Sequence, residues 1–386
     1  MLNRRTFLLT SLATTATTLS GCSNSQNALN ITLLQGSIPP QLIGDFRRIV
    51  AKKGQISLNP EINLQAILEL LTAWQKPEAA SSLIDAIPVV GRDGTKKANL
   101  ATLGDYWLQL AIADKLIQPL NTTQLEGWDN LPIIWQNLVK RDRDGNPNPR
   151  GEVYGAPYRF GNTLIAYRRD KITQTPTDWS DLWREEFKER ISLVDNYREV
   201  IGLTLKKLGY SYNTSDLSQV PNLATELQQL QQQVKLYSSD TYLQPLVLGD
   251  TWLAVGWSTD ILELTKRYSN IEAVVPASGT SLWADVWVEP SRTKETYPNE
   301  EISTLLPTWI NFCWNPKAVK QIALFTNGLS PILTGQERQN VAQLEKNQIL
   351  QSTIAAFDSS EFIYPLPPET QTEYLNLWKQ IRQVSG

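Results

Sequence analysis

Histidine is absent from this chain, and that absence excludes more classes of function than any other feature of its composition. With no imidazole among 386 residues, the chain has no Ser-His-Asp triad, no Cys-His pair and no histidine-based zinc motif. Enzymatic chemistry would therefore have to use carboxylates, lysine or tyrosine. No cofactor motif and no metal-ligand pattern is recognised either, so we expect neither a cofactor nor a metal site.

Cysteine is nearly absent as well. The chain has 2 cysteines, Cys22 and Cys313, and only Cys313 falls within the region that we expect to fold. We therefore expect no intramolecular disulfide. Cys313 is interpreted as a small hydrophobic residue of the core, because free cysteines are most often buried.

An excess of positive charge is also missing. The formal net charge is -3, so nothing in the charge balance favours nucleic acid as a partner. What is present is 41% hydrophobic residues with 13 Trp and 13 Tyr, which places the chain among globular proteins. Because 386 residues exceed the size at which one hydrophobic core stops growing, we expect two lobes.

The amino terminus has the pattern of a bacterial export signal. Twin arginines at positions 4–5 precede a mildly apolar stretch that is too short to span a membrane. That stretch ends in LSGC at 19–22, which is similar to a bacterial lipobox, where the signal is cut before Cys22 and its thiol is acylated. We expect residues 1–21 to be a twin-arginine lipoprotein signal peptide and 22–30 to be a lipidated tether to the membrane.

Short apolar segments alternate with longer helical ones through the rest of the chain, which indicates the α/β class. The predicted strands cover 31–34, 83–90, 191–194, 252–257 and 272–276, and the predicted helices begin near Pro40 or cover 62–74, 106–116, 200–208 and 260–268. Segment 141–149 is predicted to be an exposed loop before a change of lobe, and Gly209 to stop a helix. We expect a largely parallel sheet, with the ligand at the carboxyl ends of strands beside helix amino termini.

Four ordered segments carry a resemblance to a known family. They are 154–163 (YGAPYRFGNT), 195–200 (DNYREV), 255–258 (VGWS) and 282–285 (LWAD). In order and spacing they resemble the spermidine/putrescine-binding proteins of ABC importers over most of the mature chain. The resemblance implies a periplasmic-binding fold of type II, with two α/β lobes that close on a ligand about a hinge. It also implies a monomeric extracytoplasmic receptor that delivers a small molecule to ABC permease subunits and is not an enzyme.

Each lobe is expected to be assembled from two separated stretches of chain. The first lobe would contain 31–159 plus 283–328, and the second 160–282 plus 329–386. The solute would then bind in the cleft between the lobes.

The resemblance also implies a ligand site. Family members hold a polyamine with aromatic walls around its methylene chain and with carboxylates that meet its ammonium groups. Position by position, Glu199 and Asp285 match family carboxylates, and Trp257 and Trp283 match family aromatic walls. The candidate ligand-binding residues are Glu199, Asp285, Trp257, Trp283, Asn196, Tyr158 and Asp105.

Each candidate also has a purely structural interpretation. Glu199 follows Asn196 by three positions, the spacing of a helix capping box. Asp285 lies in an alternating strand, where a lone acid is most often at the surface. The two tryptophans and Tyr158 would by default be packing residues of the core.

The chain departs from the family pattern at three places. Asn196 stands where the family has an acid, and 35–38 (QGSI) stands where the family has aromatics and a carboxylate. Arg159 lies in a segment that lines the cleft, where a cation would repel a polyamine unless it turns outward or pairs with an acid. Asp105, Tyr106 and Trp107 lie near a family ligand segment and could restore an acid and an aromatic. These departures affect the expected identity of the solute. They do not affect the expected fold.

Four functions are therefore weighed. The first is a receptor for a small organic cation, polyamine-like or smaller, and the second is the same receptor for an uncharged or anionic solute. The third is a hydrolase of surface glycans that uses Glu199 and Asp285 as an acid pair about 5–10 Å apart. The fourth is a sensor or scaffold on the same fold, because one fold hosts many functions.

Overall fold

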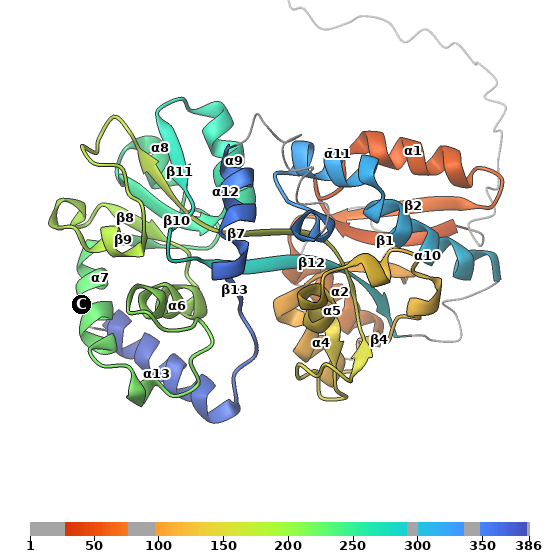
Figure 1. Cartoon of the computed structure of the whole chain (residues 1–386), viewed down its shortest axis with the longest axis horizontal. Coiled ribbons are helices and arrows are strands. Elements are labelled where there is room, and N and C mark those ends of the chain that lie inside the picture. The colour runs from red at the N-terminus through yellow and green to blue at the C-terminus, as the bar shows by residue number, and fades with distance from the viewer. Residues whose placement is uncertain (1–27, 76–96, 292–299, 336–347, 384–386) are drawn as a thin grey trace, which may run out of the picture.

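The computed structural model describes residues 28–75, 97–291, 300–335 and 348–383. These residues form two lobes that lie side by side, joined by the long strands β7 (Ala156–Arg168) and β12 (Ser281–Pro290) (Figure 1). The predicted signal peptide, Cys22 and the predicted strand at 83–90 lie outside the described residues. Within those residues, no helix has the length and the apolar character that a membrane crossing requires.

The first lobe, on the right in Figure 1, is built on three parallel strands. β1 (Ala28–Leu34) lies between β2 (Gln55–Glu61) and β3 (Leu100–Gly104) and pairs in parallel with both. It begins at Ala28, before the predicted start at 31, because Ala28 already pairs with Gln55 of β2. The remaining elements of this lobe are α1 (Pro40–Val50), α2 (Leu64–Gln75), α4 (Leu108–Ala113), β4 (Ile117–Gln118), α5 (Ile133–Val139), β5 (Lys140–Arg141), β6 (Glu152–Val153), α10 (Glu300–Trp314) and α11 (Pro316–Thr326).

Helix α1 shows how local sequence sets an element of this lobe. Pro40 occupies its first turn, where a missing N–H costs nothing. Leu42, Phe46 and Val50 follow at intervals of four and form the buried face. The predicted helix start near Pro40 is confirmed.

The second lobe, on the left in Figure 1, contains the other half of the sheet. β8 (Ile191–Leu193) pairs in parallel with β9 (Val234–Tyr237) and with β10 (Leu253–Trp257). The remaining elements are α6 (Tyr197–Lys207), α7 (Leu223–Gln233), α8 (Gln244–Leu248), α9 (Ser258–Arg267), β11 (Ile271–Val274), α12 (Gln348–Ala355), β13 (Glu361–Phe362) and α13 (Pro368–Gln383).

One sheet runs through both lobes, in the order β2-β1-β3-β12-β7-β10-β8-β9. The expectation of a largely parallel sheet is wrong, because the two joining strands run antiparallel to each other and to most of their neighbours. β12 is antiparallel to β3 and β7, and β7 is antiparallel to β10 and β11. The α/β class is confirmed, with a mixed sheet in place of a parallel one.

Two other predicted segments differ in detail. The predicted helix at 106–116 divides into the 3-10 turn η2 (Asp105–Trp107) and helix α4. The predicted exposed loop at 141–149 begins with a buried residue, because the Arg141 side chain folds back and its Nε and Nη2 donate hydrogen bonds to the Leu138 carbonyl at 3.0 and 2.6 Å. The predicted stop at Gly209 is confirmed by its positive φ of 84°.

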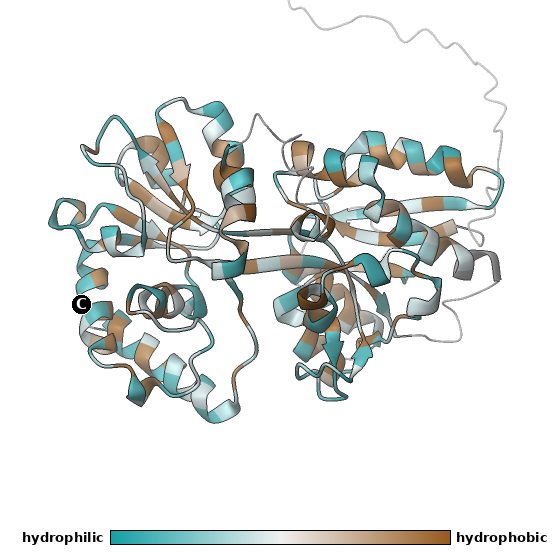
Figure 2. Ribbon diagram, viewed as in Figure 1, coloured by the Kyte–Doolittle hydropathy of each residue, from teal (hydrophilic) through white to brown (hydrophobic). Residues whose placement is uncertain are grey.

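The aromatic residues fill the core between sheet and helices, and apolar residues concentrate on the strands and the inner helix faces (Figure 2). In the first lobe, Trp287 of β12 lies edge-to-face with Trp309 of α10 at 5.7 Å, and Phe46 of α1 lies 4.9 Å from the same ring. Cys313 is buried in this core and free. The interpretation of Cys313 as a core residue is confirmed.

Candidate functional site

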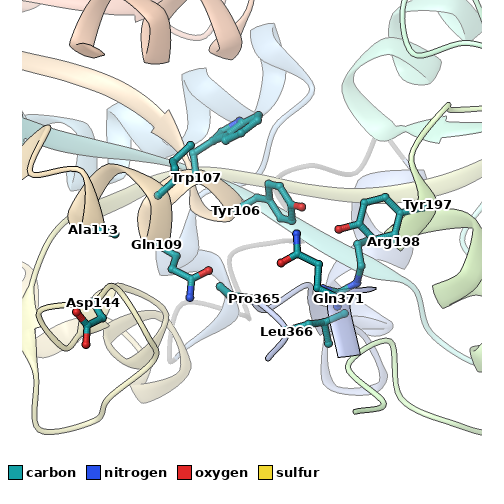
Figure 3. A pocket seen from close by; sticks show the side chains of 11 residues that line it. Tyr106, Trp107, Gln109, Ala113, Asp144, Tyr197, Arg198, Pro365, Leu366 and Gln371 are labelled. Atoms are coloured by element: carbon teal, nitrogen blue, oxygen red, sulfur yellow. The ribbon is translucent and has the colours of Figure 1, made fainter. Parts of the chain in front are cut away.

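A cavity of about 370 Å³ lies between the two lobes, and we call it the cleft pocket (Figure 3). It is lined by Tyr106, Trp107, Gln109, Leu110, Ala113, Asp144, Tyr197, Arg198, Pro365, Leu366 and Gln371. One wall comes from η2, α4 and the loop after β5, and the other from the start of α6 and the segment that enters α13. A cavity of this size between two lobes has the dimensions of a small-molecule site.

The first wall is fixed by Asp105, the residue directly after β3 and the first of η2. Its carboxylate is buried and accepts a hydrogen bond from the backbone N–H of Ala284 on β12 at 2.8 Å. Burial raises the pKa of Asp105 to about 7, although the Ala284 N–H opposes that shift. With Asp105 held against the sheet, the next two residues, Tyr106 and Trp107, line the cleft pocket.

The second wall is fixed by Asn196, which caps helix α6. Its side-chain oxygen accepts hydrogen bonds from the backbone N–H groups of Arg198 at 3.0 Å and Glu199 at 3.3 Å. This cap sets the first turn of α6, from which Tyr197 and Arg198 line the pocket. Asn196, which stands where the family has an acid, therefore has a structural role as the cap of α6.

Glu199 lies in the same turn, and its carboxylate binds groups of the joining strands. Its Oε2 accepts hydrogen bonds from Ser281 Oγ at 2.7 Å and from Thr163 Oγ1 at 3.2 Å. Burial raises the pKa of Glu199, and the two hydroxyl donors oppose that rise. Asn196 thus supplies its half of the capping box, while the Glu199 carboxylate links α6 to β7 and β12.

Asp285 and Arg159 form a buried ion pair where β7 and β12 cross between the lobes. Arg159 Nε and Nη2 lie 2.7 and 2.5 Å from Asp285 Oδ2, and the two side chains are 6% and 2% exposed. The Arg159 guanidinium carbon also lies 5.6 Å from the centre of the Trp283 ring. Burial alone would lower the pKa of Arg159, but the neighbouring Asp285 carboxylate outweighs it and the pKa is raised.

We call Arg159, Trp283 and Asp285 the hinge cluster. Of the two orientations expected for Arg159, the structure shows the one in which it pairs with an acid. Its stem packs on Gly328, where an added Cβ would lie 2.4 Å from Arg159 Cγ. The resemblance implied that Asp285 and Trp283 would contact a cationic ligand. In the structure, Arg159 of the protein itself contacts both.

The other aromatic candidates also have partners within the protein. Trp257 is half-buried and lies edge-to-face with Tyr242 at 6.0 Å. Tyr158 is fully buried, stacks on Trp287 at 4.2 Å and shares a hydrogen bond of 3.2 Å with Thr102. Tyr158 thus packs in the core of the first lobe.

The structure gathers most candidates at the junction of the lobes but does not place them on the cleft pocket. Asp105 and Glu199 each contact β12, the strand that also carries Trp283 and Asp285. None of the candidate residues is among those that line the cleft pocket. Their roles as ligand contacts therefore stay predictions.

Sequence reasoning indicated Tyr106 and Trp107 only as a possible source of an aromatic, and it missed the other residues that line the pocket. Tyr106 directly follows candidate Asp105, and Tyr197 and Arg198 lie between candidates Asn196 and Glu199. Their position in the family-like segment was a signal that could have found them. Gln371 carried no such signal, because it comes from a distant helix that only folding brings to the cleft.

Catalytic and metal chemistry finds little support in the part of the chain that the structure describes. Within it, no group of three or more His, Cys, Asp and Glu could hold a metal ion. Burial raises the pKa of the Cys313 thiol, which keeps it protonated. The cleft pocket is thus lined by aromatic rings, by amides and by isolated charged side chains.

Comparison with known proteins identifies relatives. The family model for bacterial extracellular solute-binding proteins matches residues 96–353, more than half of the chain. The spermidine/putrescine-binding periplasmic proteins of Salmonella typhimurium and Escherichia coli are each 29% identical over 226 residues, which is 58% of this chain and 61% of theirs. A putrescine/cadaverine-binding protein of Pseudomonas aeruginosa is 32% identical over 153 residues, 35% of this chain and 42% of that protein. The chain thus spans less than two thirds of the length of these relatives.

Solved structures share the whole architecture. A spermidine/putrescine ABC transporter substrate-binding protein from Streptococcus pneumoniae superposes with a TM-score of 0.73 at 22% identity, covering 92% of this chain and 99% of that one. A maltose-binding periplasmic protein of Listeria monocytogenes gives 0.59 at 12% identity over 91% and 90%. These likenesses confirm the periplasmic-binding fold of type II. By the family match, this chain belongs to the bacterial extracellular solute-binding proteins.

Proposed function

We propose that this protein is an extracytoplasmic receptor that captures a small organic cation, polyamine-like or smaller, and delivers it to the permease subunits of an ABC importer. The observation that carries this proposal is the cleft pocket between the two lobes of a solute-binding fold. Its walls contain the rings of Tyr106, Trp107 and Tyr197, and aromatic faces attract organic cations. The names of the relatives, which refer to spermidine and putrescine, support an amine as the solute.

The test is thermal unfolding of residues 23–386, which retain every described element, against a panel of amines, amino acids, sugars and anions. A solute at about 100 times its dissociation constant should stabilise the fold by about 2.7 kcal/mol. Trp107→Ala should remove most of that stabilisation. Trp252→Ala is the matched control, because Trp252 stacks on Arg190 and does not line the pocket. Failure of every amine to raise the midpoint would refute the cation receptor.

A second candidate is the same receptor for a solute that is not an amine. The observation in its favour is that Asp285 is paired with Arg159 and Glu199 is bonded to two hydroxyls. The carboxylates expected to meet ammonium groups are therefore already engaged. If only an anion or a neutral solute shifts the unfolding midpoint, the transport role stands and the amine must be abandoned.

We propose that this protein binds its solute without catalysis, and that Glu199 and Asp285 are not a catalytic acid pair. A glycosidase would need two accessible acids on either side of the scissile bond. Glu199 is 5% exposed and Asp285 is 1% exposed, so a glycan has no access to either in this conformation. Turnover of a surface glycan that disappears in Glu199→Gln would contradict this proposal.

We further propose that the receptor is a monomer, exported by the twin-arginine route and held at the membrane through lipidated Cys22. The supporting observations are the twin arginines at 4–5 and the LSGC sequence at 19–22. Labelling of cells with a fatty acid should mark the protein, and Cys22→Ser should abolish the label. Replacement of both arginines by lysine should hold the chain inside the cell.

Light scattering on residues 23–386 tests the proposal that the receptor is a monomer. A mass that corresponds to a dimer would contradict it.

A further inference from the structure

The cleft pocket contains a buried cation that lacks a carboxylate partner. Arg198 lines the pocket and is 2% exposed. The groups that its guanidinium binds are all neutral, namely the carbonyls of Tyr364 and Tyr212 at 2.8 and 3.3 Å and Asn213 Oδ1 at 3.3 Å. Its Nε has no hydrogen-bond partner among the described residues. A buried charge left with only neutral partners is costly, which indicates that a further group completes the site.

Two phenol groups accompany this guanidinium. Tyr106 of the first lobe and Tyr197 of the second line the pocket, and their side chains face each other across the cleft near Arg198 (Figure 3). A guanidinium with adjacent hydroxyl donors is the set of groups that binds a carboxylate best. Glu199, the nearest acid in sequence, interacts electrostatically with Arg198 but forms no ion pair or hydrogen bond with it among the described residues, and its carboxylate is bound by Ser281 and Thr163.

The far end of the pocket carries the opposite charge. Asp144, in the loop after β5, lines the pocket on the side away from Arg198 (Figure 3). It is exposed, and among the described residues its carboxylate takes part in no ion pair or hydrogen bond. Trp107 and Gln109 lie between these two ends. The pocket is therefore positive at its buried end and negative at its open end.

We infer that the solute of the cleft pocket is amphoteric, an amine that also carries an acid group, with its acid at Arg198 and its ammonium toward Asp144. This inference rests on the proposed function and narrows its solute to amines that also carry an acid group. A simple diamine would place an ammonium against the buried guanidinium, where like charges repel at low dielectric. A dicarboxylate would place its second acid against Asp144.

The test uses three solutes of one length, which are 4-aminobutanoate, butane-1,4-diamine and butanedioate. Calorimetric titration of residues 23–386 should give at least about tenfold tighter binding of 4-aminobutanoate than of either symmetric solute, the factor that corresponds to about 1.4 kcal/mol. Tyr197→Phe and Asp144→Asn, which leave the contacts of Arg198 in place, should each weaken that binding at least about threefold. Asp240→Asn, an exposed acid that does not line the pocket, should leave it unchanged.

The possible outcomes separate the inference from the proposed function. Tighter binding of the diamine would overturn the amphoteric solute and leave the cation receptor intact. Tightest binding of butanedioate, without binding of either amine, would overturn both. If none of the three binds with a dissociation constant below about 1 mM, the amphoteric solute is rejected, and the longer amines of the unfolding panel, such as spermidine, decide the cation receptor separately.

Discussion

The hinge cluster and the cleft pocket each contain a buried arginine, and the two arginines have opposite kinds of partner. Arg159 in the hinge cluster is bonded to the Asp285 carboxylate and lies over the Trp283 ring. Among the described residues, Arg198 in the cleft pocket donates hydrogen bonds only to neutral oxygens, lies over the Tyr374 ring and has no partner for its Nε. In the hinge cluster the two charged groups are paired with each other, although Trp283 Nε1 has no hydrogen-bond partner among the described residues. In the cleft pocket the charged group has only neutral hydrogen-bond partners.

This difference separates residues that preserve the fold from residues that remain available to a solute. In the ion pair at the strands that join the lobes, removing one member leaves the other charge buried alone, so neither residue can be changed by itself without a loss of stability. The guanidinium of Arg198, which has no carboxylate partner among the described residues, remains available to an acid group of a solute.

The largest effect is expected from breaking the ion pair. Asp285→Leu should lower the free energy of unfolding by about 3–5 kcal/mol, because the Arg159 guanidinium would stay buried without its carboxylate. Chemical denaturation measures this loss. The double variant Arg159→Met with Asp285→Leu should recover most of it, since both charges are then gone. If the single and the double variant are equally stable, the unpaired charge of Arg159 is not the cause of the lost stability.

Asp105→Asn tests the charge buried beside the first wall of the pocket. The pKa of Asp105 is raised to about 7 in the fold from 3.8, so the folded state holds a proton that the unfolded chain loses between these values. The wild-type protein should therefore lose stability as pH rises from about 4 to about 7, whereas an asparagine carries no such cost. From pH 4 to 8, the stability of the variant relative to wild type should rise by up to about 4 kcal/mol.

Denaturant unfolding at the two pH values measures this difference. Asp240→Asn serves as the control, because Asp240 is exposed and should show little pH-dependent difference. A difference between Asp105→Asn and wild type that does not change with pH would mean that Asp105 is not held in a desolvating environment.

Gly328→Ala should disturb the hinge cluster sterically. The new methyl would meet Arg159 Cγ at 2.4 Å and Cδ at 2.6 Å, and overpacking of this kind costs about 1–3 kcal/mol. Gly44→Ala in α1 is the matched control, because nothing lies within 4 Å of its added methyl and alanine favours a helix by up to about 1 kcal/mol. Melting temperatures that fall equally for both variants would argue against close packing around Arg159.

Tyr197→Phe should have the smallest effect on the empty protein and a clear one on binding. Removal of one hydroxyl from the partly exposed Tyr197 should change stability by no more than about 0.5 kcal/mol. The stabilisation given by a saturating solute should nevertheless fall, as thermal unfolding with and without solute would show. Unchanged solute stabilisation would remove Tyr197 from the binding wall.

Local sequence patterns predicted the elements better than the sheet. The helix start at Pro40 and the stop at Gly209 depend on the fixed φ of proline and the positive φ open to glycine, which act over a few residues. The direction of β7 and β12 depends on strands distant in sequence. An alternation of strands and helices indicates the α/β class without showing that two strands cross between lobes.

The family-like segments located the region of the site but not the partners of its residues. They predicted that Asp285, Trp283 and Glu199 would lie near one another, and these residues do meet around β12. Which acid Arg159 would pair with depends on the register of β7 against β12, where Asp285 lies opposite Arg159. No pattern in a single sequence specifies that register across more than a hundred residues.

The most direct test of this account is the position of a bound solute in a crystal structure of residues 23–386 grown with a ligand from the unfolding panel. The account predicts density in the cleft pocket between Trp107 and Arg198, with the Arg159 to Asp285 ion pair unchanged. Density against Asp285 and Trp283, with the Arg159 side chain displaced, would contradict this prediction. The ligand site would then be the one that the family resemblance implied.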